Sequence, residues 1–426
     1  MRCNLRTLAL VMLLSVCGLS LLPTAPAFGA QTRKGRKQAG KPRSPAPPAR
    51  FVSGRAAPRI PFDLLSNLVL LRARLNDSEP LWFILDTGAD STVVNARLAK
   101  ELGLRPAGHL KGTSGGEAVE AGLVSGVSFK LPGVEVPNLT VATVPLDPLA
   151  PLMGRAIGGI FGNDLISRFV VEVDYGQRVV NLYAPAAYRY EGAGERLRVN
   201  LAGRRPFVDA FVTPKGGAPV LGRFAAATGS SGALLLDSRF VRAHRLLQTA
   251  SATSLGNTGG VGGLSRTLVG RVENIRVGRF RIDDPIVSFS QAGGGGRAGA
   301  GFDGVLGGEV FRRFKVILDY SRRQLILEPN EHLSEAVEED MSGFEFVAEG
   351  EDFGTYVINE IVPDSPASEA GLREEDELTE VEGRPARELG LERIRRLFMQ
   401  EGKEYLLGIK RGEQRLPVKL KLRRLR

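Results

Sequence analysis

The sequence predicts a mainly β protein built from more than one domain. Its 426 residues exceed the length of an ordinary single domain. Glycine accounts for 52 of them, and this share of about 12% against a usual ~7% is typical of a chain rich in turns. Long stretches with helical periodicity are few, whereas short apolar runs bounded by turn residues are common. These observations favour strands over helices in the folded part.

The positive charge of the chain is confined to its N-terminal segment. The formal net charge is +10, but residues 1–59 contain eleven basic and no acidic residues. The remainder, 60–426, holds 46 basic and 47 acidic residues and is nearly neutral. The basic surface expected of a nucleic-acid-binding protein is therefore absent from the folded part.

Residues 1–30 have the features of a secretory signal peptide. Two arginines precede an apolar run over 8–22, and an Ala-x-Ala site follows at 25–27. A retained membrane anchor is the alternative, although the run is short for a spanning helix. Both cysteines, Cys3 and Cys17, lie in this leader, and lipidation of Cys17 stays open. We expect an exported periplasmic or extracellular protein without disulfides and without a membrane span after signal removal.

Residues 31–59 are basic, rich in proline and poor in large apolar side chains, so we expect a disordered linker. The first folded unit is expected over 60–187. Strands are predicted at 68–75 and at 81–85, a helix capped by Asn95 at 95–102, and a Gly-rich hairpin at 108–129. A short helix flanked by strands is predicted within 158–183.

A second copy of this pattern follows. The segment 304–327 aligns without gaps to the end of the first unit at a constant offset of 145 residues. The identical pairs include Phe169 with Phe314, Asp174 with Asp319 and Tyr175 with Tyr320. The sequence thus predicts an internal duplication, with lobes over 60–187 and 194–329. Glycine-rich stretches at 256–263 and 293–296 are expected to form a mobile hairpin and a loop tip.

A buried strand leads directly into a carboxylate at the sequence Asp86-Thr87-Gly88. Burying an unpaired charge is costly, so a carboxylate in this position is usually there for chemistry. The equivalent loop of the second copy reads Ala227-Thr228-Gly229. Each copy also contains two hydrophobic residues followed by glycine, namely Ile160-Phe161-Gly162 and Val305-Leu306-Gly307.

These loops and glycine-ending elements resemble the aspartic peptidases of the retropepsin and pepsin type. The resemblance implies a bilobed pair of acid-protease-like β-barrels, with an active-site loop from each lobe. It implies that the threonine hydroxyls lock the two loops together, that Ile160–Gly162 and 305–307 brace them, and that Asp86 is catalytic. In such enzymes two aspartates share one proton, and one of them activates water.

Ala227 departs from this pattern because a methyl group can neither hold the shared proton nor activate water. Asp237, Asp303 and the pair Ser230-Ser231 are not convincing replacements from their local sequence. Three alternatives stay open: pairing of two Asp86 residues in a dimer, residual activity from one aspartate, and a pseudopeptidase that binds polypeptides. The duplicated second lobe argues against the dimer, and the oligomeric state is not predicted.

The third unit, over 341–426, contains Ser365-Pro366-Ala367, Ala370-Gly371-Leu372 and Val381-Glu382-Gly383. Strands at 356–361 and 405–410 and a helix at 391–399 are expected. The unit resembles PDZ domains of the bacterial, protease-associated kind. The resemblance implies that it binds an extended peptide or chain end by adding a strand to a sheet edge, with a groove near Ser342, Gly343 and Phe344. Docking on the lobes without a ligand is the alternative.

No metal or cofactor is expected, because His109, His244 and His332 are isolated and no phosphate-binding glycine loop is present. The sequence therefore predicts an exported, aspartic-type endopeptidase-like protein that acts on polypeptides. A catalytically impaired polypeptide-binding module is the alternative, and Ala227 favours it.

Overall fold

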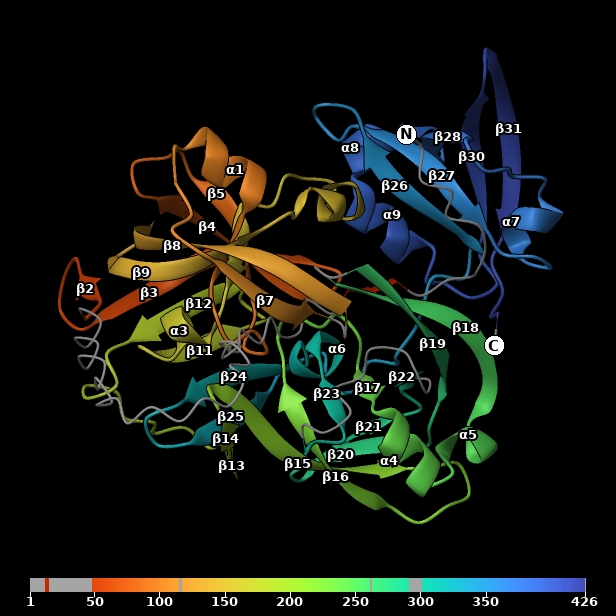
Figure 1. The fold of residues 1–426 in the computed structure, drawn as a ribbon. Coiled ribbons are helices and arrows are strands. Elements are labelled where there is room, and N and C mark those ends of the chain that lie inside the picture. Colours follow the sequence, from red (N-terminus) through yellow and green to blue (C-terminus); the bar gives the residue numbers. More distant parts are fainter. Residues whose placement is uncertain (1–11, 15–47, 115–116, 261–262, 291–300, 426) are drawn as a thin grey trace, which may run out of the picture.

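The computed structural model describes residues 12–14, 48–114, 117–260, 263–290 and 301–425 (Figure 1). Strands predominate in three sheets, which confirms the prediction of a mainly β protein. Two β-rich lobes lie against each other, and a smaller C-terminal unit packs beside the first lobe (Figure 1). Within the described ranges, no helix is long and apolar enough to cross a membrane.

Lobe 1 comprises residues 48–187. Its elements are β2 (Arg50–Phe51), β3 (Ala56–Leu65), β4 (Leu68–Leu75), β5 (Leu81–Leu85), β6 (Val93–Asn95), α1 (Ala96–Glu101), β7 (His109–Ser114), β8 (Glu117–Leu131), β9 (Val134–Val144), the 3-10 turn η1 (Asp147–Leu149), α2 (Ala150–Met153), β10 (Gly159–Phe161), α3 (Asn163–Ile166), β11 (Val170–Asp174) and β12 (Val179–Tyr183). The side chain of Asn95 caps α1 by accepting from Arg97 N, as its position in the sequence predicts.

Lobe 2 comprises residues 194–329. Its elements are β13 (Glu195–Arg198), β14 (Asn200–Ala202), β15 (Arg205–Thr213), β16 (Val220–Ala226), β17 (Leu234–Leu236), α4 (Ser238–Ala243), α5 (Leu246–Thr249), β18 (Ser251–Gly260), β19 (Gly263–Arg271), β20 (Asn274–Val277), β21 (Phe280–Asp283), β22 (Ile286–Ser290), β23 (Gly304–Leu306), α6 (Gly308–Phe311), β24 (Phe314–Asp319) and β25 (Gln324–Pro329). The short strand β1 (Met12–Leu14), from the predicted leader, pairs with β18.

One sheet joins the two lobes. It runs in the order β13-β25-β24-β11-β12-β3 before it continues into the rest of lobe 1. At the junction, β11 and β24 pair antiparallel, with Val171 opposite Leu318 and Val173 opposite Val316. Because 171 and 173 correspond to 316 and 318 at the offset of 145 residues, the pairing is reciprocal, as two copies related by a twofold axis would produce. The internal duplication itself stays a prediction.

The two lobes share one hydrophobic core, whereas the C-terminal unit has its own. In lobe 1 the ring of Phe83, on β5, stacks on Phe161 of β10 with centroids 4.6 Å apart. Phe129 meets both rings edge to face. These large buried side chains fix the two strands that end at the Asp86 loop.

The C-terminal unit comprises residues 341–425 and folds around a six-stranded sheet. Its elements are β26 (Phe344–Glu349), β27 (Thr355–Ile361), α7 (Pro366–Glu369), β28 (Glu377–Val381), β29 (Arg384–Pro385), α8 (Ala386–Leu389), α9 (Leu391–Leu397), β30 (Glu404–Arg411) and β31 (Gln414–Lys421). Ser365 caps α7 in a capping box, and Gly371 ends the turn after it with φ of +77°.

The predicted linker over 31–59 is wrong at its C-terminal end. Phe51 packs edge to face on Phe169, with centroids 5.9 Å apart, and Ala57 is fully buried in the core. A few apolar residues within a basic, proline-rich stretch were enough to join the lobe. Residues 15–47, the predicted loop tip at 293–296 and part of the predicted hairpin at 256–263 lie outside the described residues.

Candidate active site

Strand β5 delivers Asp86 to the centre of the interface between the lobes. The side chain is fully buried. Its Oδ1 accepts hydrogen bonds from Gly88 N at 2.7 Å in its own loop and from Gly229 N at 3.2 Å in the loop of lobe 2. Its Oδ2 has no hydrogen-bond partner among the described residues. One carboxylate oxygen is therefore held by both lobes, whereas the other is buried without a hydrogen bond from the described residues.

Burial raises the pKa of Asp86 to about 6. The amides of Gly88 and Gly229 and the positive charge of Arg205 lower this pKa, and the negative charge of Asp90 raises it, but desolvation is the largest cause. A carboxyl group with such a pKa exchanges its proton close to neutral pH. It could therefore act as a general base and then as a general acid.

Thr87 and Thr228 lock the two loops together. Thr87 Oγ1 donates to Ala226 O at 2.6 Å and accepts from Thr228 N at 3.1 Å. Reciprocally, Thr228 Oγ1 donates to Leu85 O at 2.6 Å and accepts from Thr87 N at 3.2 Å. All four bonds are buried, and each joins lobe 1 to lobe 2. This is the arrangement that the resemblance implies for the threonines.

The predicted braces lie beside the loops in the same way in both lobes. Strand β10 runs parallel to β5, and Asp86 N donates to Phe161 O at 3.0 Å. Strand β23 runs parallel to β16, and Ala227 N donates to Leu306 O at 3.0 Å. The outer residues Ile160 and Val305 are buried on these strands.

The glycines that end the braces are required by close packing. A Cβ on Gly162 would lie 2.4 Å from the backbone C and O of Ser91, and one on Gly307 would lie 2.3 Å from Gly232 O. Since real Cβ atoms essentially never come within 3.0 Å of such neighbours, only glycine fits at either position.

The loop of lobe 2 packs directly on Asp86 but brings no carboxylate. A Cβ added to Gly229 would lie 2.2 Å from Asp86 Cγ, and Ala227 is fully buried. The aspartates considered as replacements serve local structure: Asp237 caps α4 by accepting from Arg239 N, and Asp303 accepts from Arg223 N. Ser230 is buried, and its carbonyl accepts from Gly308 N.

Two residues that the sequence did not predict as site residues support the Asp86 loop through hydrogen bonds. Asn163, at the start of α3, donates from Nδ2 to Thr87 O at 2.8 Å. Tyr320, which follows β24 of lobe 2, donates its hydroxyl to Asn163 Oδ1. The identity of Tyr175 and Tyr320 in the repeat was a usable signal for the tyrosine. No sequence pattern pointed to Asn163.

An ion pair also crosses the interface close to the site. Arg205 Nε of β15 lies 3.1 Å from Asp90 Oδ1, and both side chains are largely buried. Arg205 lowers the pKa of Asp86, and Asp90 raises it. The pair therefore links the two lobes close to Asp86.

The residues predicted for the peptide groove of the C-terminal unit form a tight turn before β26. Ser342 is fully buried and donates its N–H, at 2.8 Å, and its hydroxyl to Asp340 Oδ1. Gly343 has φ of +79° and packs against Ser365. Phe344 is buried in the core of the unit. This turn leads into β26, the end strand of its sheet, and the peptide groove itself stays a prediction.

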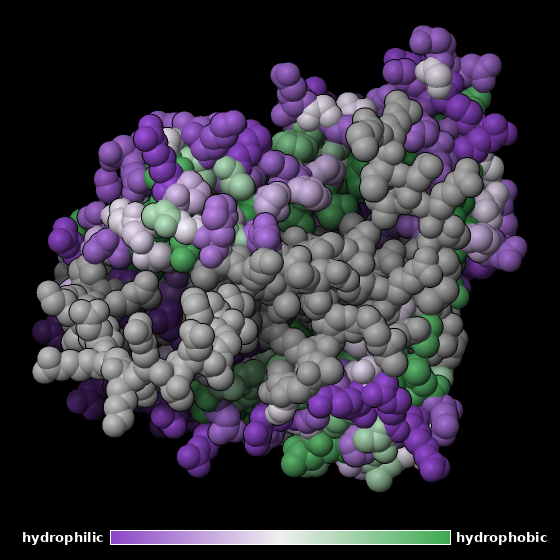
Figure 2. All heavy atoms as spheres, viewed as in Figure 1, coloured by the Kyte–Doolittle hydropathy of each residue, from purple (hydrophilic) through white to green (hydrophobic). Residues whose placement is uncertain are grey.

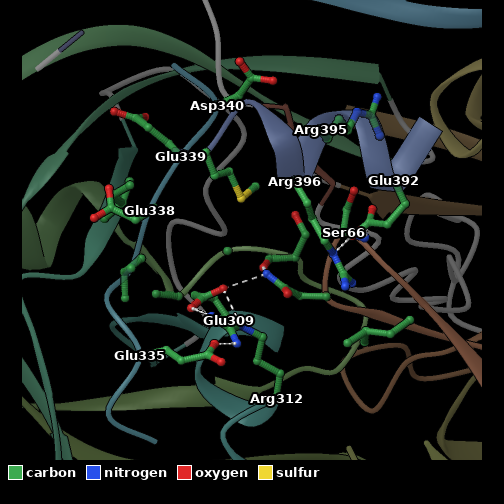
Figure 3. A pocket seen from close by; sticks show the side chains of 18 of the residues that line it. Ser66, Glu309, Arg312, Glu335, Glu338, Glu339, Asp340, Glu392, Arg395 and Arg396 are labelled. Atoms are coloured by element: carbon green, nitrogen blue, oxygen red, sulfur yellow. Dashed lines mark hydrogen bonds and ion pairs between the residues drawn. The ribbon is translucent and has the colours of Figure 1, made fainter. Parts of the chain in front are cut away.

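A cavity of about 930 Å³ lies between the lobes and this unit. Figure 3 shows Glu309 and Arg312 of lobe 2 on one side of it, and Glu392 and Arg396 of α9 on another. His332 bonds to Glu335 at 2.6 Å in its wall. Across the described ranges, no three His, Cys, Asp or Glu side chains are grouped so that they could hold a metal ion.

Comparison with known proteins agrees with these features. The family model described as aspartyl protease matches residues 71–165, and that of the PDZ domain matches residues 357–411. Among solved structures, the chain is similar to the aspartic proteinase from Irpex lacteus, with 12% identity, a TM-score of 0.42, and coverage of 66% of this chain and 99% of that one. No curated protein matches. The first matched segment contains both Asp86 and its brace. The chain is thus similar to aspartyl proteases over residues 71–165 and to PDZ domains over residues 357–411.

Proposed function

We propose that this protein is an exported aspartic-type endopeptidase that acts on polypeptides through the single carboxylate of Asp86. The observation that carries the proposal is Asp86 Oδ2, which has no hydrogen bond from the described residues and belongs to a fully buried side chain whose pKa burial raises to about 6. An unpaired buried carboxylate is costly to keep. Its retention at the centre of an intact loop lock supports a chemical role.

In the proposed reaction, ionised Asp86 removes a proton from a water molecule as the water oxygen bonds to the scissile carbonyl carbon. The protonated carboxyl group then gives this proton to the amide nitrogen as the C–N bond breaks. Ala227 supplies no second acid to polarise the carbonyl. We therefore expect a rate lower by about 10²–10⁴-fold than with an aspartate at that position, since this is the usual contribution of a positioned acid or base.

The second candidate function is an exported pseudopeptidase that binds polypeptides, and the buried methyl group of Ala227 favours it. Pairing of two Asp86 loops in a dimer is disfavoured, because Thr87 and Thr228 already join the Asp86 loop to lobe 2 within one chain.

Proteolysis of a reduced and alkylated protein between pH 3 and pH 8 separates these functions. The wild type, Asp86→Asn and Ala227→Asp would be compared. Cleavage by the wild type that is lost in Asp86→Asn supports the peptidase. If the wild type is inert and only Ala227→Asp cleaves, the peptidase proposal fails and the pseudopeptidase stands. Sedimentation of the active species tests the dimer, since an active monomer excludes it.

Export is proposed from the leader alone. N-terminal sequencing of the protein recovered outside the cytoplasm should give a start close to residue 31, whereas a retained Met1 would contradict cleavage of the leader.

A further inference from the structure

The groove of the PDZ domain faces lobe 1. Strand β26 is the end strand of its sheet and, within the described residues, pairs only with β27. Ligands of such domains add a strand along an edge of this kind. In this chain the edge of β26 and the helix α9 face the short helix α2 of lobe 1, which is the yellow helix between them and the rest of that lobe in Figure 1.

The segment that contains α2 and Gly154 touches both walls of the groove. A Cβ on Gly154 would lie 3.6 Å from Leu391 Cβ, at the start of α9, and 3.8 Å from Ala348 Cβ, on β26. Arg395 Nη1 of α9 donates to Leu152 O at 3.0 Å. The segment 150–154 therefore lies where a ligand strand beside β26 would have to pass.

Side chains of α9 make further contacts around this segment. The Arg395 guanidinium also lies over the ring of Phe346 on β26, 5.6 Å from its centroid, so one side chain spans the groove. Nearby, Ser66 N of lobe 1 donates to Glu392 Oε2 at 2.9 Å. Figure 2 shows hydrophobic residues gathered on this face where lobe 1 meets the PDZ domain. The cavity of about 930 Å³ adjoins this contact and is lined by Leu152 and Arg395.

The same segment is connected to the Asp86 loop. Immediately after Gly154, the guanidinium of Arg155 lies 4.6 Å from the ring centroid of Trp82, on the strand that ends at Asp86. Gly158 N donates to Trp82 O at 2.8 Å. Strand β10 follows at once, and its Phe161 O accepts from Asp86 N. A displacement of α2 would therefore act within a few residues on the strands that position the carboxylate.

We propose that the segment 150–154 is a removable plug of the PDZ groove. Binding of an extended polypeptide chain end between β26 and α9 displaces this plug, and the displacement is coupled to the Asp86 loop through β10. The inference rests on the polypeptide binding in the proposed function and adds its regulation. Peptide binding and hydrogen exchange test this regulation without measuring cleavage. Their outcome is therefore the same whether or not the protein is an active peptidase.

The plug can be locked by a disulfide. The separation of 3.8 Å between the two Cβ positions of Gly154 and Ala348 matches the usual value of about 3.8 Å in disulfides. Gly154→Cys with Ala348→Cys, made in the full chain together with Cys3→Ser and Cys17→Ser, should oxidise spontaneously to one intramolecular bond. Because Gly154 has φ of +60°, a side chain there strains the backbone, and the single variant Gly154→Cys controls for that strain. If the single variant folds and the double variant forms no bond, the proposed contact is wrong.

Leu152→Lys is the counterpart of the disulfide variant, because it is designed to release the plug and open the groove. Leu152 is partly buried against lobe 1 and lines the cavity together with Arg395. A lysine there puts a second positive charge into that cavity, which should weaken the contact between the plug and α9. The probe is a fluorescent peptide with a free C-terminal carboxylate, selected on Leu152→Lys from a pool randomised at its last four residues. A groove that is open for about 10% of the time or less predicts that the peptide binds Leu152→Lys at least about tenfold more tightly than it binds the wild type.

The oxidised double-cysteine variant of Gly154 and Ala348 (the oxidised lock) should no longer bind the same peptide, and reduction of its disulfide should restore binding to the wild-type level. Equal binding to the oxidised lock and the wild type would overturn the plug. Hydrogen exchange tests the coupling: the amides of Asp86 and Gly88 should exchange faster in Leu152→Lys and in the peptide complex than in the oxidised lock. Identical exchange in all three states would overturn the coupling.

Discussion

At the scale of single residues, the two oxygens of Asp86 differ in their surroundings. Oδ1 accepts two backbone N–H groups, whereas Oδ2 is buried without a partner among the described residues. In an enzyme with two aspartates the second carboxyl would share a proton there. Here the facing loop contributes a methyl group and a glycine, so desolvation acts on Asp86 without that compensation.

This desolvation makes stability depend on pH. The pKa of Asp86 is about 6 in the folded protein and 3.8 in the unfolded chain. The protonated carboxyl of Asp86 therefore contributes its full share to the free energy of unfolding below pH 3.8. This contribution, about 3 kcal/mol, is lost as the pH rises through about 6 and Asp86 ionises in the folded protein. In Asp86→Asn this loss should disappear, and the variant should be more stable than the wild type at pH 7.5. Urea unfolding at pH 4 and pH 7.5 measures both.

Asp340 provides the matched control, because burial also raises its pKa to about 6. Asp340→Asn should remove its own share of the pH dependence and leave that of Asp86. If Asp86→Asn has the wild-type pH dependence, the carboxylate is not desolvated as described.

The threonine lock predicts a large effect from a nearly isosteric change. Thr228→Val leaves Leu85 O and Thr87 N buried without their partner. We expect a loss of about 2–4 kcal/mol in the free energy of unfolding. Thr140→Val, at an exposed threonine of β9, should change it by less than about 0.5 kcal/mol. Equal losses in chemical denaturation would contradict the role of the lock.

At the scale of elements, the two tyrosines of the repeat have unequal partners. The hydroxyl of Tyr320 donates a hydrogen bond to Oδ1 of Asn163, which in turn donates to Thr87 O in the Asp86 loop. The hydroxyl of Tyr175 is buried and has no partner in the described part of the chain. The position that corresponds to Asn163 at the offset of 145 residues is Gly308, which offers no side-chain acceptor.

This difference gives two opposite expectations for the same substitution. Tyr320→Phe should lower the free energy of unfolding by about 1–3 kcal/mol, because Asn163 loses a buried bond. Tyr175→Phe removes an unsatisfied polar atom and should be neutral or stabilising by about 1 kcal/mol. Thermal unfolding of both variants compares them directly, and equal destabilisation would show that Tyr175 is bonded after all.

The brace between β10 and α3 leaves no room for a side chain at Gly162. Gly162→Ala would place Cβ 2.4 Å from backbone atoms of Ser91. We expect a loss of about 3 kcal/mol or more. At Gly108 nothing lies within 4 Å of an added Cβ, so Gly108→Ala should be nearly neutral. A stable, soluble Gly162→Ala protein with wild-type unfolding would refute this packing.

At the scale of the whole molecule, the two lobes share a hydrophobic core, whereas the PDZ domain has its own. One hydrophobic cluster spans both lobes, and the sheet containing β11 and β24 is continuous between them. The PDZ domain has a separate core and meets the lobes across a cavity. We therefore expect two calorimetric transitions, one for both lobes together and one for the PDZ domain. Separate unfolding of the two lobes would contradict the shared core.

The sequence alone determined the mainly β class, the two loops with their braces, and the replacement at Ala227. These are local patterns, because a strand that ends in Asp-Thr-Gly and a glycine that must tolerate close packing can be recognised within a few residues. The extent of the linker was misjudged, since the burial of Phe51 depends on Phe169, which lies far away in the chain.

Only the tertiary structure decided which partners these residues meet. The unequal oxygens of Asp86, the support from Asn163 and Tyr320, and the position of α2 against β26 all join segments separated by many residues. Such contacts depend on how the lobes and the PDZ domain pack, and no short pattern encodes that packing. The sequence showed that alanine stands at 227 in the loop corresponding to that of Asp86. The fold showed that Asp86 is buried and that, within the described residues, its Oδ2 has no hydrogen-bond partner.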